Sequence, residues 1–359
     1  MSSAGPSSTS PPPAAAFPGL HPSALAEEPH TRVDMVHMEL LHHYMTHDYV
    51  YPLMDHGMRE VIITTALQEP YVMHSVLALS AHHLGVSQPE RRSFYHRLAI
   101  QLQTRALTLF NSNDLGLLGD SVEKRIPVFI FSALLGFHAL CDALAHRDTD
   151  FESALARFMG YIRLHRGIHA VMNGYWEAMK QTRLKYIFEE MVPQWFRLEN
   201  EGKGHECDDI RQRIASRGLD EEEVAALTRA VDLVQWVLGA KPNPASRAYV
   251  LCSWSPMLAV PFVQMLEAGR PEALAVLAYY FLALHHCRSV WMVGGSGQHL
   301  LTLLAEHFRG GEWYAWVEGP YQELQRSLAE EALKERSMTD ANDSSSTSHP
   351  SPANQSEKT

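Results

Sequence analysis

The chain has 359 residues, of which 46% are apolar and 20% charged, so it holds enough apolar material for a large buried core and is not a disordered chain. Lys and Arg number 30 against 41 Asp and Glu, which gives a formal net charge of −11. A surface with this average charge repels a nucleic-acid duplex, which counts against unaided DNA binding.

The two ends of the chain differ in composition from the part between them. Residues 1–32 are rich in Ser, Pro and Ala and have neither the basic start nor the uninterrupted apolar core of a secretory signal, so we expect a disordered arm. Residues 336–359 are polar and Ser-rich, and we expect a disordered tail there. Residues 33–335 are predicted to be one soluble helical body, with a loop or hinge at 199–217, where the apolar periodicity breaks.

Apolar residues recur at helical spacing along this body, as they do between Phe94 and Phe110. We therefore expect an all-α fold, a bundle or array of about a dozen helices. The ranges with this pattern are 33–47, 70–84, 94–110, 121–143, 150–172, 175–198, 221–238, 271–287, 298–308 and 320–333.

Two stretches, 126–145 and 273–284, are apolar nearly all round and approach the length that a membrane span requires. The first contains Pro127, His138 and Asp142, and the second is short. Polar and charged groups are rare inside true spans. We interpret both stretches as buried central helices and expect no membrane span.

The four cysteines, Cys141, Cys207, Cys252 and Cys287, are far apart in the sequence, and all but Cys207 lie in apolar stretches. Buried free thiols in a reducing compartment explain this pattern best. A two-zinc cluster needs six closely spaced thiolates, so these residues do not predict a metal centre.

The standard catalytic signatures do not occur. The GGSG at 294–297 follows no predicted strand, lacks the final glycine of a nucleophile elbow, and breaks the spacing of a dinucleotide-binding loop, so it is interpreted as a turn between helices. His43 with His47 and His165 with His169 have i, i+4 spacing, but neither pair has the intervening glutamate of a zinc protease or an identifiable third ligand. We therefore predict no catalytic, cofactor-binding or metal-binding residue, and no enzyme.

Six blocks, taken in order, resemble the fungal-specific regulatory domain that follows the zinc cluster in fungal zinc-cluster (Zn2Cys6) transcription factors, in particular the sterol-uptake-control-like members. The opening of the domain resembles MELLHHYMTH, and the paired tryptophans at its end resemble EWYAWVEGP. The blocks between them are PYVMHSVLALSAHHL, YHRLAIQLQTRALTLF, YIRLHRGIHAVM and PEALAVLAYYFLALHHCRSVWMVGG.

The resemblance implies a nuclear regulator, able to shuttle to the cytoplasm, whose helical body controls transcription. In the family a cysteine cluster and a basic linker precede this domain, whereas here a short Ser/Pro arm precedes Val33. We therefore expect a transcriptional regulator of a fungal metabolic pathway that acts through protein contacts, as a homodimer or with a DNA-binding factor, without its own DNA-binding module. The alternatives are a helical enzyme or accessory protein of a biosynthetic cluster, and a shortened gene product whose zinc cluster lies upstream.

The resemblance also implies an effector, since some relatives bind a sterol or another apolar metabolite inside the helical body. Bundles commonly hold ligands between helices, and the aromatic and thioether side chains near the C-terminal helices suit an apolar one. We place this effector pocket near Phe281, Trp291, Met292 and Trp313. The alternative, which is the more frequent one for such side chains, is plain core packing.

Overall fold

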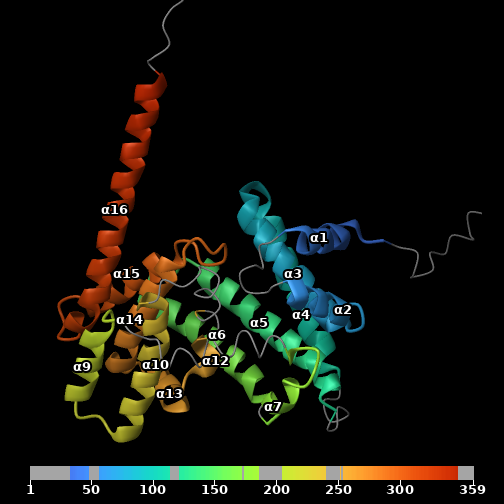
Figure 1. Cartoon of the computed structure of the whole chain (residues 1–359), viewed down its shortest axis with the longest axis horizontal. Helices are drawn as coiled ribbons and strands as arrows, with labels where there is room; N and C mark the ends of the chain where they lie inside the picture. Colours follow the sequence, from blue (N-terminus) through green and yellow to red (C-terminus); the bar gives the residue numbers. More distant parts are fainter. Residues whose placement is uncertain are drawn as a thin grey trace, which may run out of the picture. The chain divides into compact units, whose positions relative to one another are not determined.

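The computed structural model describes residues 33–47, 56–113, 121–171, 174–185, 204–239, 251 and 254–346. These residues form fourteen α-helices and two 3-10 helices and contain no strand, which confirms the predicted all-α fold (Figure 1). The predicted arm at 1–32 and residues 347–359 of the predicted tail lie outside the described residues.

Most of the helices are short to medium in length, and α16 is the longest of those described. In chain order they are α1 (Met35–Thr46), α2 (His56–Ala66), α3 (Pro70–Ser87), η2 (Pro89–Arg91), α4 (Arg92–Asn111), η4 (Glu123–Arg125), α5 (Ile126–Ala145), α6 (Phe151–Val171), α7 (Trp176–Met179), α9 (Asp208–Ser216), α10 (Glu221–Gly239), α12 (Trp254–Met257), α13 (Val260–Glu267), α14 (Pro271–His286), α15 (Ser296–Phe308) and α16 (Tyr314–Ser346).

The chain divides into two compact units, Met1–Glu39 and Leu40–Thr359, and the boundary falls inside α1. In the described part of the smaller unit, the Asp34 carboxylate accepts hydrogen bonds from the amides of Val36 and His37 at 2.9 and 3.2 Å. These bonds satisfy two of the amide groups that are left without helical partners at the start of α1. Everything that follows concerns the larger unit.

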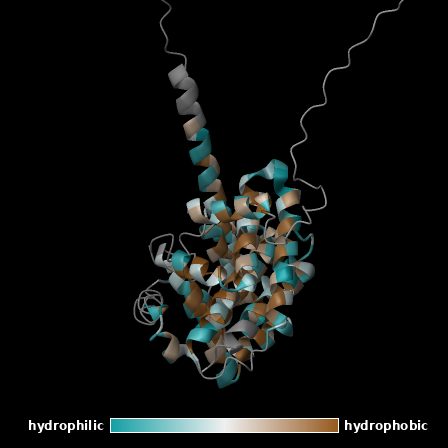
Figure 2. Ribbon diagram, turned by 90° about the vertical axis from the view of Figure 1, so that its right-hand side faces the viewer, coloured by the Kyte–Doolittle hydropathy of each residue, from teal (hydrophilic) through white to brown (hydrophobic). Residues whose placement is uncertain are grey.

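Helices α3 and α4 form an antiparallel pair near the start of the larger unit. Near the start of α3, the Tyr71 ring lies edge-on to Phe110 at the end of α4, with centroids 5.5 Å apart. Towards the end of α3, His82 contacts His96 near the start of α4 and His138 of α5. Helix α3 therefore packs against both α4 and α5, and Figure 2 shows hydrophobic residues gathered where helices face one another.

Helix α14 is the central helix of the C-terminal half. Every residue from Glu272 to His285 is buried, and the helix packs against α9, α10, α13, α15 and α16. Alanines let the neighbouring helices approach closely, and the aromatic rings of Tyr279, Tyr280 and Phe281 fill the space between them. The interpretation of this stretch as a buried helix is confirmed.

Helix α5 with the preceding turn, 123–145, is the one described helix that is long and apolar enough to cross a membrane. Of its most apolar window, 67% is buried against the rest of the protein, as in the core helix of a packed domain. It packs against α2, α3 and α6. The contacts agree with the interpretation of 126–145 as a central helix.

The helix predicted at 175–198 is wrong in its described part, where α7 ends at Met179. The Thr182 hydroxyl donates a hydrogen bond to the carbonyl of Met179 at 2.7 Å and accepts one from the amide of Leu184 at 3.2 Å. Threonine side chains that bond the nearby backbone in this way compete with the helical hydrogen bonds. The chain therefore turns here, and residues 186–198 lie outside the described residues.

Two further elements differ from the predicted ranges. Helix α9 lies within the range expected as a loop or hinge, and it buries Ile210 and Ile214, one turn apart on one face. Helix α16 begins at Tyr314 with Pro320 inside it, and it continues past residue 335 to Ser346. Residues 329–336, AEEALKER, are all strong helix formers, which accounts for the helix as far as Arg336.

Candidate functional site

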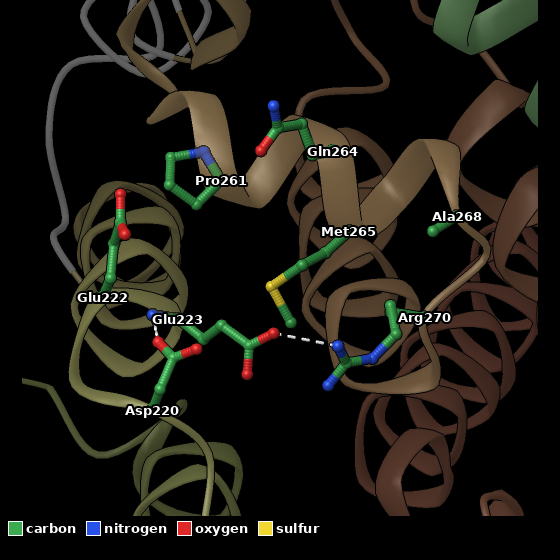
Figure 3. Close-up of a pocket in the computed structure, with 8 residues that line it drawn as sticks. All are labelled: Asp220, Glu222, Glu223, Pro261, Gln264, Met265, Ala268 and Arg270. Carbon is green, nitrogen blue, oxygen red and sulfur yellow. Dashed lines mark hydrogen bonds and ion pairs between the residues drawn. The ribbon is translucent and has the colours of Figure 1, made fainter.

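A pocket of about 330 Å³ lies between the start of α10, helix α13 and the turn that leads into α14 (Figure 3). Its acidic wall consists of Asp220, Glu222 and Glu223. Its opposite side comes from α13 and the residues after it: Gln264, Ala268 and Arg270 form a second wall, and Pro261 and Met265 form the floor. The two walls are about forty residues apart in the sequence and are brought together by the packing of α10 against α13.

The acidic wall is also the N-terminus of α10. The Asp220 Oδ1 atom accepts a hydrogen bond from the amide of Glu223 at 2.8 Å, so Asp220 caps the helix. Glu221, Glu222 and Glu223 fill the first turn, where negative charge stabilises the helix dipole. Local helix chemistry thus explains why four acidic residues follow one another here.

Arg270 crosses the pocket from the opposite wall and is held by two carboxylates. Its Nη1 atom donates to Glu223 Oε1 at 2.9 Å, the bond drawn in Figure 3, and its Nε atom donates to Glu272 Oε2 at 3.3 Å. The hydrogen bonds that Arg270 donates to Glu272 and then to Glu223 raise its pKa above the ordinary value. The guanidinium therefore ties the start of α14 to the first turn of α10.

Glu272 lies under this corner of the pocket and is buried, with 5% of its side chain exposed. Arg217 Nε donates to its second oxygen at 3.4 Å. Burial alone raises the pKa of Glu272, but hydrogen bonds from its own backbone amide, from Arg270 and from Arg217 outweigh burial, so the net shift is downward. The carboxylate is accordingly ionised and bonded by both arginines.

The floor of the pocket is apolar. The Met265 side chain is 5% exposed, and its thioether extends into the space between Glu223 and Arg270 (Figure 3). The Pro261 ring faces the same space. Three carboxylates and one guanidinium line the pocket, so its walls carry net negative charge around an apolar floor.

The four residues predicted for an apolar effector lie elsewhere, and two of them are in the core. Phe281 on α14 is 1% exposed and meets the Phe158 ring edge-on at 5.7 Å. Met292 is 6% exposed, and its Sδ atom lies 4.0 Å from Cys141 Sγ. Close neighbours therefore already surround these two side chains.

The other two predicted effector residues are half-buried and have different neighbours. The Trp291 ring lies edge-on to His83 with centroids 5.2 Å apart. The Arg217 guanidinium lies 4.5 Å from the centre of the Trp313 ring, and the centres of the Trp313 and Trp316 rings are 4.9 Å apart. The effector pocket stays a prediction.

The histidines singled out in the sequence make structural hydrogen bonds. His43 Nε2 lies 2.7 Å from His83 Nδ1, and His165 Nδ1 lies 2.8 Å from the hydroxyl of the buried Ser255. The His169 side chain is outside the described residues. Within the described ranges, no group of three His, Cys, Asp or Glu side chains is arranged to hold a metal ion.

The cysteines agree in part with the expectation of buried thiols. Cys141 and Cys287 are buried, and Cys252 lies outside the described residues. Cys207, which we did not expect in an apolar environment, is also fully buried. Burial raises the pKa of its thiol to about 12, so it is protonated and unreactive at neutral pH.

The enzyme alternative calls for a cleft with a carboxylate at hydrogen-bond distance from a histidine. The His205 Nδ1 atom lies 2.7 Å from Asp208 Oδ2, but these side chains are 96% and 57% exposed. Neither residue lines the pocket described above. The pair has the character of a surface interaction rather than an acid–base site.

The turn between helices that is predicted for the GGSG segment holds for Gly294 and Gly295, whereas Ser296 and Gly297 are the first residues of α15. Gly294 has a φ of +46°, a conformation that side chains other than glycine rarely adopt. Gly297 packs directly on α14, since a Cβ atom there would lie 2.3 Å from the backbone nitrogen of His285. These glycines serve the backbone geometry of the turn and helix packing.

Two comparisons with known proteins place this all-helical structure in a class. The family described as "Fungal specific transcription factor domain" matches residues 39–183, which run from α1 past α7. Residues 39–183 thus match a fungal specific transcription factor domain, and the resemblance found in the sequence blocks is confirmed.

A relative from Gibberella zeae, named "Zn(2)-C6 fungal-type transcription factor", is 21% identical over 310 residues. The similarity covers 80% of this chain and 61% of the relative, so the chain spans about three fifths of the relative's length. Both matches are described as transcription factors. The pocket lies outside the residues that the family match covers.

Proposed function

We propose that this chain is the regulatory body of a fungal transcriptional regulator that works in the nucleus through contacts with other proteins. The match of residues 39–183 to the fungal transcription factor domain carries the proposal. The net charge of −11 supports action through protein contacts, because it disfavours direct binding to a nucleic-acid duplex.

The proposal is tested by moving the chain to a promoter artificially. The full chain is fused to a heterologous DNA-binding domain and expressed in a fungus that carries the matching reporter gene. The fusion is expected to raise or lower reporter output relative to the DNA-binding domain alone. Equal output from both, at equal protein levels, would contradict the proposal.

The finer proposal is an apolar effector, such as a sterol, that controls a metabolic pathway. Its support is the resemblance to sterol-uptake-control-like factors and the half-buried rings of Trp291 and Trp313 at the C-terminal helices. A ligand that binds only the folded state raises the melting temperature in proportion to its occupancy. A panel of sterols and other apolar metabolites that leaves the melting temperature unchanged would count against this effector.

A further inference from the structure

We propose that the pocket between α10 and α13 binds a cationic side chain, arginine or lysine, presented by a partner protein. This inference rests on the proposed function and names the chemistry of one contact through which it acts. Three features support the inference: the size of the pocket, its apolar floor, and the carboxylate oxygens that accept no hydrogen bond from the described residues of the protein.

The volume suits one long side chain. The pocket measures about 330 Å³, at the lower end of the roughly 300–1,000 Å³ of pockets that hold drug-sized ligands. Its floor is the Met265 thioether and the Pro261 ring. Arginine and lysine bury their methylene stems along apolar surface and keep the charged head in a polar environment. Methionine adapts its shape to such a stem.

Within the described residues, the acidic wall has carboxylate oxygens that accept no hydrogen bond from the protein. Asp220 uses Oδ1 to cap α10, and Glu223 uses Oε1 to bind Arg270. Within the described part of the chain, the Glu222 carboxylate has no hydrogen bond or ion pair, and Figure 3 shows it on the rim of the pocket. Carboxylates bind guanidinium and ammonium groups through charge-assisted hydrogen bonds.

The pocket's own cation does not neutralise this wall. Arg270 is held by Glu223 on one side and by the buried Glu272 on the other, so its charge is shared between two carboxylates. An anionic ligand would meet net repulsion here. A purely apolar ligand would cover the carboxylates without bonding them, which costs free energy. A cationic group on an aliphatic stem can bond the carboxylates of the wall while its methylene groups pack on the apolar floor.

The test uses the full chain with its methionine methyl groups labelled for NMR, and the Met265 signal is assigned by its loss in Met265→Leu. The probe is N-acetyl-arginine amide. Its control is N-acetyl-citrulline amide, which has nearly the same shape without the charge. The arginine compound is expected to shift the Met265 methyl signal saturably, and the citrulline compound to leave it in place. Equal shifts from both, or none from either, would overturn the proposal.

A matched pair of variants tests Glu222, whose carboxylate makes no hydrogen bond or ion pair within the described residues. Glu222 lines the pocket, whereas Glu221 lies on the same turn and does not. Glu222→Gln is expected to weaken binding of the arginine compound about threefold, as loss of a partly exposed ion pair does. Glu221→Gln is expected to bind like wild type. Equal affinities of the two variants would overturn the role of the acidic wall.

The reporter assay separates the two proposals. If the wild-type fusion changes reporter output but the arginine compound does not shift the Met265 signal, the proposed regulatory function is supported. The proposed binding of a cationic side chain is then refuted. An inert wild-type fusion refutes the regulatory function, whatever the pocket binds.

Discussion

His82 Nε2 lies 2.9 Å from His138 Nδ1, and this hydrogen bond joins α3 to α5 inside the core. Both side chains are buried, at 8% and 6% exposure. One imidazole must accept while the other donates, so the bond exists only while at least one ring is neutral. Protonation of both rings would place two like charges in the core.

This relationship predicts acid sensitivity. Burial lowers the pKa of His138 to about 4, with His96 lowering it further and Asp142 partly offsetting the shift, while burial and His138 lower the pKa of His82. In the unfolded chain these imidazoles titrate near pH 6.5. The unfolded state therefore binds more protons as the pH falls from about 6.5 to about 4, and the free energy of unfolding decreases across that window.

The measurement is urea denaturation at a series of pH values between 8 and 4.5. The midpoint is expected to fall steadily below about pH 6.5. In His138→Gln the dependence on pH should be shallower, because one of the shifted groups is gone. A wild-type midpoint that is the same at pH 7.5 and pH 5 would contradict the assignment of neutral histidines to the core.

The contact between α14 and α15 predicts the effect of one added methyl group. In Gly297→Ala the new Cβ atom meets the backbone of His285 at 2.3 Å and the carbonyl oxygen of Phe281 at 2.7 Å. Because backbone atoms cannot move aside cheaply, the helices must separate, and we expect a loss of about 1–3 kcal/mol in the free energy of unfolding.

The matched control for that substitution is Gly160→Ala on α6. Gly160 is exposed, and a Cβ atom there meets nothing within 4 Å. Alanine in a helix interior is favoured over glycine by about 0.5–1 kcal/mol, so this variant should be more stable than wild type. Denaturant titration of the two variants should give changes of opposite sign; changes in the same direction would refute the close packing at Gly297.

The buried carboxylate of Glu272 predicts the effect of removing one charge. Glu272→Gln leaves Arg217 and Arg270 without the anion that they share, and the three residues link the α9–α10 turn to the start of α14. We expect a loss of about 1–3 kcal/mol, less than for a fully buried pair because both guanidiniums are partly exposed. Glu330→Gln, on an exposed face of α16, is the control and should be neutral. Equal stability of the two variants would contradict this role of Glu272.

The long helices were predictable because their apolar pattern extends over several turns. Helices α3, α4 and α14 begin within about two residues of the predicted starts, and Pro70 and Pro271 occupy the first turns where proline is favoured. Helices α9 and α13, with nine and eight residues, are too short for periodicity to distinguish them from loops. Each is fixed by its packing against larger helices.

The candidate pocket could not be predicted from the sequence. The acidic run at its wall is a signal that a helix begins, and that local explanation is also true, since Asp220 caps α10. Only the approach of α13 turns this helix start into the wall of a pocket. In the same way, the sequence indicates that Phe281 and Met292 are apolar and helical or near a helix, but not which neighbours fill the space around them.

The most direct test of the account is the reporter assay made with the pocket variants. The wild-type chain, Glu222→Gln and Glu221→Gln are fused to the same heterologous DNA-binding domain, and reporter output is measured at equal protein levels. The account predicts that the wild-type and Glu221→Gln fusions change output to the same extent, and that Glu222→Gln reduces this change. A wild-type fusion that behaves like the DNA-binding domain alone would contradict the account.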